Sequence, residues 1–418
     1  MFTLIKFELK KMMSGRIFWI LLLVFAAFVA LNFITTTFGY TIYDTNLNKL
    51  TGLSAIRYDR DQQNQYAGKY SDEESVEIEK KAYEVFDKPE WQIGENENPT
   101  NPSRLTDETY WKYARPYEAV WYGTIRQNSF DDIIIPTLKS GDLTNLYYSS
   151  MLRFAQSNIN MFPSPGEDTL EAQRLLSMYE KVEQPFTIEF TTGMKALVNS
   201  LVSILLFPGI AILIICLSPI FSKEYSTKSA PILLTTKHGK TKLIKSKLIA
   251  AYLFASGLFL AMALLYVGFY LLCWGTSGMT ASVQLIPDFL ASPYNLKMWQ
   301  LLLAVLGMGY LGFLFITSVA LLISAKAKNA YTALIPLAAI TYLPLIDITG
   351  VSGSLQKVLL LFPANLVEAT ELLKFPIFYN IGGLLVDRAV LSVIISVVAV
   401  IVLTAFASRF FRKHQVSN

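Results

Sequence analysis

Long apolar segments constrain this chain more than any other feature of its sequence. A membrane-spanning helix needs about 20 predominantly apolar residues, and six segments are of that kind. They are residues 16–40, 195–221, 248–274, 298–323, 330–346 and 386–408. Only 16% of the 418 residues are charged, against roughly 25% in an ordinary soluble domain. The sequence therefore predicts an α-helical integral membrane protein with six transmembrane helices.

Two of the six segments need a further argument. Residues 330–346 form the shortest one and contain Pro336 and Pro344. A kinked transmembrane helix tolerates such prolines when neighbouring helices satisfy the freed carbonyl groups. Residues 16–40 are longer than the apolar part of a signal peptide, and no small-residue cleavage site follows them. We therefore expect both segments to stay in the membrane as helices.

Lysine and arginine gather in four short segments that lie between or beside the predicted spans. These are residues 1–15, the loop at 222–247, the loop that follows 298–323, and the tail at 409–418. Basic loops of membrane proteins stay in the cytoplasm, and six spans allow all four segments to share that side. We therefore expect a multi-pass protein of the plasma membrane with both termini in the cytoplasm.

Residues 41–194 carry the opposite charge, with 25 acidic and 15 basic residues. Such a long, polar segment between the first two spans predicts an extracytoplasmic domain. Ser71 and Glu74 have the spacing of a capping box, and residues 167–182 place leucines at helical spacing. We therefore expect a large, mostly helical domain. Its acidity fits contact with a cationic or amphipathic peptide, and the solubility of an exposed domain explains the same charge.

Residues 239–241, Gly-Lys-Thr, look like the end of a phosphate-binding loop, but the rest of that motif is missing. The motif requires a glycine five residues before Gly239, and Leu234 stands there. The histidines are His238 and His414, and neither H-E-x-x-H nor G-x-S-x-G occurs. We therefore expect no catalytic residue, metal site or cofactor on this chain, and no nucleic-acid partner.

Residues 1–15 predict an amphipathic helix that lies in the membrane interface. Apolar residues fall on one face at helical spacing, and Lys6 and Lys10 lie off that face. The apolar residues are Phe2, Ile5, Leu9, Met12 and Met13. Gly15 is a natural bend between this flat helix and the upright helix that follows it.

The loop at 222–247 contains seven lysines and one glutamate. Its first part can continue as a short helix beyond the membrane, with apolar side chains that dock onto a cytoplasmic partner. We expect the later lysines to fix the topology and to contact anionic lipid. These are Lys237, Lys240, Lys242, Lys245 and Lys247.

Residues 347–385 are amphipathic, and Pro363 and Pro376 interrupt them. The segment is too broken for a regular span. Irregular backbone enters a bilayer only where protein covers it. We therefore expect a re-entrant segment that dips into the outer leaflet.

Together these features resemble the permease of an ABC-2 type exporter. The likeness lies in the interfacial "elbow" helix, the six spans, the short cytoplasmic helix after the second span and the half-buried helices before the sixth. In that family the loop after the second span has an acidic residue, then L-L-x-T, then a lysine that enters the third span. Glu224, residues 233–236 and Lys247 match this pattern. The basic tail at 409–416 is similar as well.

The resemblance covers residues 1–40 and about 195–416, and it departs from the family pattern at two places. Lys228 and Ser229 stand where a glycine–threonine pair is expected, and Pro231 stands where an acidic residue is common. The predicted domain at 41–194 has no counterpart in the pattern.

The resemblance implies a membrane subunit that works with a separate cytoplasmic ATPase subunit, which binds the ATP and magnesium. It also implies a dimer with a second copy or a homologue, contact with membrane lipids, and export of an amphiphile such as a peptide, an antimicrobial or a lipid-like molecule. Movement of the ATPase would reach the spans through a coupling helix. Its candidate residues are Lys223, Glu224, Tyr225, Ser226, Thr227, Lys228, Ile232, Leu233 and Leu234.

Three glycines of the fourth span are candidates for close helix approach, as small residues are in bilayers. They are Gly307, Gly309 and Gly312. Two alternatives to an exporter stay open: an ATPase-coupled mechanotransmission protein, and a membrane sensor that acts through its extracytoplasmic domain.

Overall fold

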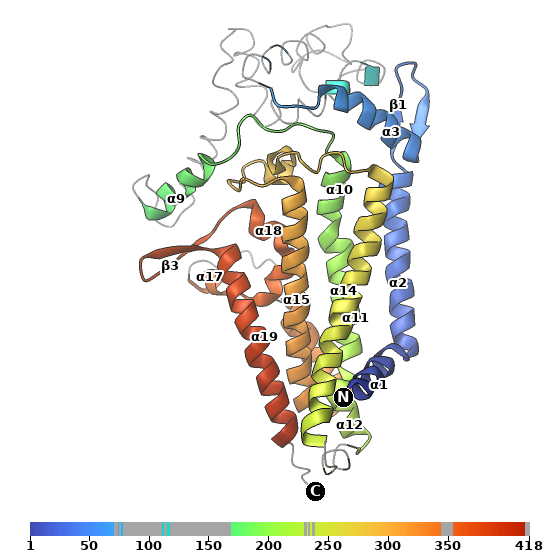
Figure 1. The fold of residues 1–418 in the computed structure, drawn as a ribbon, viewed down its shortest axis with the longest axis vertical. Helices are drawn as coiled ribbons and strands as arrows, with labels where there is room; N and C mark the ends of the chain where they lie inside the picture. The colour runs from blue at the N-terminus through green and yellow to red at the C-terminus, as the bar shows by residue number, and fades with distance from the viewer. Residues whose placement is uncertain are drawn as a thin grey trace.

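Long helices that run between two ends of an elongated molecule make up most of the fold (Figure 1). The computed structural model describes residues 1–70, 74, 77, 111–112, 115–117, 169–229, 232, 235, 239–343 and 354–413. The helices of the bundle are α2 (Arg16–Phe33), α10 (Thr192–Ser200), α11 (Phe207–Leu217), α12 (Pro219–Ser226), α14 (Ile244–Trp274), α15 (Met298–Lys326) and α19 (Arg388–Lys413). Helix α1 (Phe2–Met13) lies beside them at the end that holds both termini.

Within the part of the chain that the structure describes, five helical runs are long and apolar enough to cross a membrane. They are Arg16–Phe38, Thr192–Ser226, Thr241–Trp274, Met298–Lys326 and Arg388–Arg412. The shortest has 23 residues, which at about 1.5 Å per residue exceeds the roughly 30 Å of a hydrocarbon core. The prediction of an α-helical membrane protein is therefore confirmed.

The helix at the fifth predicted span is shorter than the sequence suggested. Helix α16 (Ala330–Tyr342) has 13 residues, about 20 Å at the usual rise, and this is less than a hydrocarbon core requires. Its start is fixed by a capping box, in which Asn329 Oδ1 accepts a 2.9 Å hydrogen bond from the Thr332 N–H. The last predicted residues, 344–346, lie outside the described part, so the count of six spans stays a prediction.

The first two spans contain π-helical turns, and a polar cluster lies beside these turns. The turns are η1 (Ile34–Phe38), which continues α2, and η8 (Leu201–Leu206), which joins α10 to α11. The Tyr266 hydroxyl lies 3.0 Å from Asn32 Oδ1 and 2.7 Å from Ser200 Oγ. Trp274 Nε1 donates a 3.0 Å hydrogen bond to Thr37 Oγ1. These bonds join α2, α10 and α14 within the apolar bundle, where polar groups need partners.

An irregular segment enters the bundle before α19. It consists of α17 (Ser354–Leu360), the 3₁₀ turn η13 (Pro363–Glu368) and α18 (Ala369–Lys374). A Cβ added to Gly312, at the middle of α15, would lie 3.2 Å from Val367 Cγ2. The rings of Phe315 and Phe362 are 5.9 Å apart. The segment thus reaches the middle of α15, and protein covers it there, as irregular backbone in a bilayer requires.

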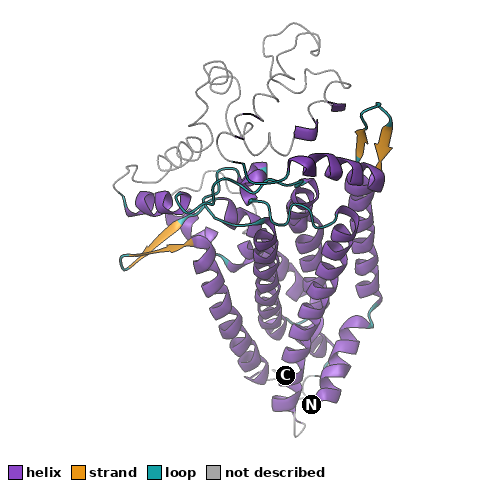
Figure 2. Cartoon of the chain, turned by 45° about the horizontal axis from the view of Figure 1, so that its top comes forward, coloured by secondary structure: helices purple, strands orange, loops and turns teal. Residues whose placement is uncertain are grey.

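Short strands and helices lie at the end opposite the termini (Figure 2). Strands β3 (Phe378–Ile381) and β4 (Leu384–Asp387) pair antiparallel and lead into α19, and β1 (Thr41–Tyr43) pairs antiparallel with β2 (Lys49–Thr51) before α3 (Gly52–Gln63). Helix α9 (Leu170–Tyr179) lies where residues 167–182 predict a helix. The shorter 3₁₀ and π turns are η2 (Asn64–Tyr66), η6 (Arg115–Tyr117), η9 (Gly239–Leu243), η10 (Val283–Leu285) and η11 (Pro287–Phe289).

A buried carboxylate ties α3 to η6 and to Tyr40 at the end opposite the termini. Asp59 of α3 is buried, and Arg115 Nε donates a 3.0 Å hydrogen bond to its Oδ1. Arg115 Nη2 also lies 2.7 Å from the Tyr40 hydroxyl. The helix predicted from Ser71 falls mostly outside the described residues.

The three glycines of α15 have different surroundings. A Cβ at Gly309 would lie 2.8 Å from Leu206 Cδ2, and one at Gly312 would be close to Val367. Both glycines therefore allow close packing within this chain. A Cβ at Gly307 would meet nothing within 4 Å, so only Gly307 of the three offers open space to a neighbouring subunit.

Replacing Gly309 by leucine is expected to push α15 away from η8 and to destabilise the fold by about 1–3 kcal/mol. The matched control is Gly307→Leu, which places the same side chain on the same helix in open space. Thermal unfolding of the purified protein in detergent measures both. Equal midpoints for the two variants would contradict the packing described for α15.

Candidate functional site

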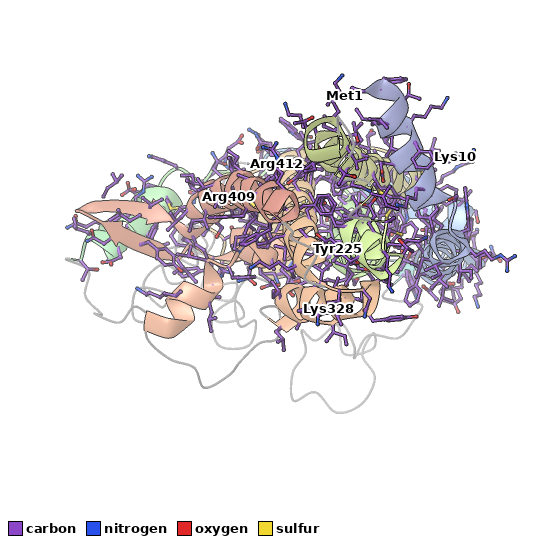
Figure 3. The ribbon with its side chains drawn as sticks, turned by 90° about the horizontal axis from the view of Figure 1, so that it is seen from below. Met1, Lys10, Tyr225, Lys328, Arg409 and Arg412 are labelled. Atoms are coloured by element: carbon purple, nitrogen blue, oxygen red, sulfur yellow. The ribbon has the colours of Figure 1, made fainter. Side chains whose placement is uncertain are left out.

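Basic side chains gather at the end of the molecule that holds both termini. Seen from that end, Lys10 of α1, Lys328 after α15, and Arg409 and Arg412 of α19 all lie on it (Figure 3). Tyr225 of α12 lies among them. This surface is called the basic end below. The basic end brings together the described parts of the four basic segments that the sequence predicts on one side of the membrane.

The predicted coupling residues lie on α12 and the turn that follows it. Lys223, Ser226, Thr227 and Lys228 are exposed, and the Tyr225 hydroxyl donates a 3.0 Å hydrogen bond to the Ala325 carbonyl of α15. Ile232 is 71% exposed. Leu233 and Leu234 lie outside the described residues. Glu224 differs from the others, because its side chain is turned into the protein and is only 4% exposed.

The end of α12 shows why a glycine would suit the position of Lys228 in the family pattern. The Ser229 N–H bonds to the Glu224 carbonyl and the Lys228 N–H bonds to the Tyr225 carbonyl, each at 3.0 Å. This is the bonding pattern of a Schellman cap, which places one residue in the left-handed region. That residue is Lys228, with φ +54°. A glycine would adopt this backbone without steric cost. In this chain a lysine occupies the position instead.

A serine of α15 holds the start of α12. The Ser324 hydroxyl accepts hydrogen bonds from the Phe221 N–H at 3.0 Å and the Ser222 N–H at 3.1 Å. It donates one of 2.7 Å to the Ser218 carbonyl. Backbone groups at a helix start have no partner within the helix, and Pro219 begins α12 at this point. The serine satisfies these groups and fixes α12 to α15.

A buried ion cluster lies behind α12. Lys247 Nζ, at the start of α14, is 2.6 Å from Glu224 Oε1 and 3.0 Å from Glu8 Oε1 of α1. It also lies 3.3 Å from the Ile220 carbonyl. Lys247 is fully buried, and Glu8 and Glu224 are each 4% exposed. One ammonium group therefore joins three segments that are far apart in the sequence.

The charges of this cluster balance one another. Lys11 Nζ lies 3.6 Å from Glu224 Oε1, so two carboxylates face two ammonium groups. Burial lowers the pKa of Lys11, and the nearby positive charge of Lys247 lowers it further. A buried charge is costly unless it is paired and hydrogen-bonded. Separating α1, α12 and α14 would expose the cluster or leave a charge without its partner.

The expectation that Lys247 contacts anionic lipid is wrong. Its side chain has no exposed surface, because carboxylates from α1 and α12 meet it inside the protein. The sequence does contain a signal for this. Glu8 is the one acidic residue among the first 40, and Glu224 is the one acidic residue of the loop at 222–247. An isolated acid in a basic segment indicates a specific partner.

The fold and this end define an α-helical, multi-pass membrane protein whose helices are joined by a buried ion cluster at the basic end. A family model described as "ABC-2 family transporter protein" matches residues 2–416. The chain therefore belongs to the ABC-2 family of transporter proteins, and the resemblance drawn from the sequence is confirmed. Neither the curated proteins nor the solved structures compared with the chain gave a match.

Family membership identifies the chain as the membrane component of an ABC transporter, a class that works with an ATPase subunit. This coarse assignment agrees with the described structure. Residues 239–243, which include the Gly-Lys-Thr sequence, form the helical turn η9 and run straight into α14. The glycine that would open a phosphate-binding loop before them is replaced by Leu234.

Replacing Lys247 by methionine is expected to destabilise the protein by about 3–5 kcal/mol, because it leaves Glu8 and Glu224 buried without their partner. The control is Lys245→Met, since Lys245 is exposed on the same turn and a surface change of this kind stays within about 0.5 kcal/mol. Unfolding in detergent compares the two variants.

A second variant separates the ion cluster from a simple loss of side-chain packing. Adding Glu8→Gln and Glu224→Gln to Lys247→Met removes the unpaired charges and is expected to restore most of the lost stability. If Lys247→Met is as stable as the wild type, the cluster does not hold these segments together.

Proposed function

We propose that this chain is the permease subunit of an ABC exporter. It couples ATP hydrolysis by a separate cytoplasmic ATPase subunit to the export of an amphiphilic substrate, such as a peptide, an antimicrobial or a lipid-like molecule. The basic end faces the cytoplasm, and a second copy or a homologue completes the transporter. The observation that supports this most is the ion cluster of Glu8, Glu224 and Lys247, which lies directly behind the exposed residues of α12.

Because of the ion cluster, a movement of α12 would be passed on to α1 and α14. Its exposed side, with Lys223, Ser226 and Thr227, is open to a partner, while Glu224 on its inner side holds α1 and α14. Glu224 thus contributes to coupling by position, since it lies behind the docking surface. A displacement of α12 without α1 and α14 would break buried ion pairs, so the three segments move together as one body.

The same displacement reaches the opposite end through continuous helix. Helix α12 ends the run Thr192–Ser226, which has 35 residues and spans roughly 50 Å at the usual rise. Ser324 joins α12 to α15, which runs the length of the bundle as well. Closure of the ATPase against α12 would therefore rock whole spans.

Ile232 provides the sharpest test of the docking surface, because it is apolar and 71% exposed beyond the end of α12. Affinity-tagged chain, purified from its native membrane, is expected to retain an ATPase subunit. Ile232→Asp is expected to reduce that retention, and the substrate-stimulated ATP hydrolysis of the complex, by about tenfold, the loss typical of one buried apolar anchor.

The matched control is Thr3→Asp. It introduces the same charge at an exposed position of the basic end, in the first turn of α1, where a negative charge is favourable. This variant is expected to keep its ATPase. Hydrolysis of ATP by the chain alone, or purification without any ATPase, would contradict the proposed function.

A further inference from the structure

A groove of about 890 Å³ runs along the bundle. Side chains of α2 and α14 form its two walls, and Leu9 and Met13 of α1 lie at one end. Along α2 and η1 the groove extends from Phe18 to Phe38. This is about 30 Å at the usual rise, the thickness of a hydrocarbon core.

The lining is almost entirely apolar, and the groove opens toward the membrane. Trp19 lines it and is 59% exposed. Gly257 of α14 also lines it, and a Cβ added there would meet nothing within 4 Å. Exposed apolar surface at this depth faces lipid tails, so the groove would be filled by hydrocarbon rather than by water.

Three exposed cations stand one or two helical turns from lining residues at the basic end of the groove. Lys6 and Lys10 precede Met13 by seven and three residues, so helical spacing places them beside this lining residue, at the edge of the apolar face of α1. Arg16 precedes Trp19 by three residues and extends the α2 wall by one turn. All three side chains are exposed. Figure 3 shows Lys10 pointing outward from α1.

No acidic residue of α1 balances these cations. Glu8, its one acid, lies on the other face of the helix and is buried against Lys247. The mouth of the groove is therefore positive, and its length is apolar. This combination complements a molecule with an anionic head and a hydrocarbon tail. Each lysine or arginine near a membrane surface attracts anionic lipid measurably.

We propose that this groove binds an anionic phospholipid from the leaflet at the basic end. Lys6, Lys10 and Arg16 hold the headgroup phosphate, and an acyl chain lies between α2 and α14. The lipid completes the contact between α2 and the rest of the bundle, since only 17% of the apolar window of α2 is buried by protein. Binding needs no ATPase and no transported substrate, so it is independent of the proposed function.

Trp19 reports on the occupant directly, because it lines the groove. The full chain is placed in phosphatidylcholine nanodiscs that contain a minor fraction of phosphatidylglycerol. The acyl chains of either the phosphatidylglycerol or an equal amount of the phosphatidylcholine are brominated and quench nearby tryptophan fluorescence. The Trp19 signal is the difference between the wild type and Trp19→Phe.

Brominated phosphatidylglycerol is expected to quench Trp19 at about tenfold lower fraction than brominated phosphatidylcholine, since several cations contribute to the selectivity. The variant K6Q/K10Q/R16Q is expected to lose this preference. The matched control K328Q/R409Q/R412Q removes three exposed cations elsewhere on the basic end (Figure 3) and is expected to keep it. Gly257→Leu fills the groove and is expected to reduce quenching by both lipids.

The comparison of the two lipids on the wild type decides the proposal without relying on any variant. Equal quenching by the two lipids overturns it, because the groove would then be ordinary lipid-facing surface. Protection of Trp19 from both lipids also overturns it, since a second copy of the chain would then fill the groove.

Discussion

The pairing of Lys247 with Glu8 and Glu224 is the interaction on which the basic end depends. It joins α1, the exposed helix α12 and the start of α14. Buried ion pairs add little net stability, but breaking one is costly. The cluster therefore defines how these segments can move more than how strongly they fold.

The sequence predicts the spans well, because a run of apolar residues is local and a bilayer demands a minimum length. It predicts contacts between distant segments poorly. Lys247 enters a span at its edge, where lysines often reach the interface, and its partner Glu8 lies 239 residues away. Gly309 packs against Leu206 and Gly312 packs against Val367. These neighbours are also distant in the sequence. Helix α16 ends two residues before Pro344, a local helix-ending signal that hydropathy does not register.

Among the site residues, too, the sequence predicts some positions and misses others. Exposed positions such as Lys223 and Ile232 follow from the basic, interrupted pattern of the loop at 222–247. The inward orientation of Glu224 does not, because α12 turns that side toward α1 and α14. The helix cap at Lys228 requires a residue in the left-handed conformation, whatever its side chain. The position in the family pattern is therefore set by the backbone.

The position of η13 has a mechanical consequence. Helix α15 is bonded to α12 through Ser324 near one end, and Val367 of η13 packs against Gly312 at its midpoint. Close-packed interiors transmit displacement rather than absorb it. A tilt imposed on α15 from the basic end would therefore shift this 3₁₀ turn as well, so a movement of α12 reaches the segment that packs at the midpoint of a long helix.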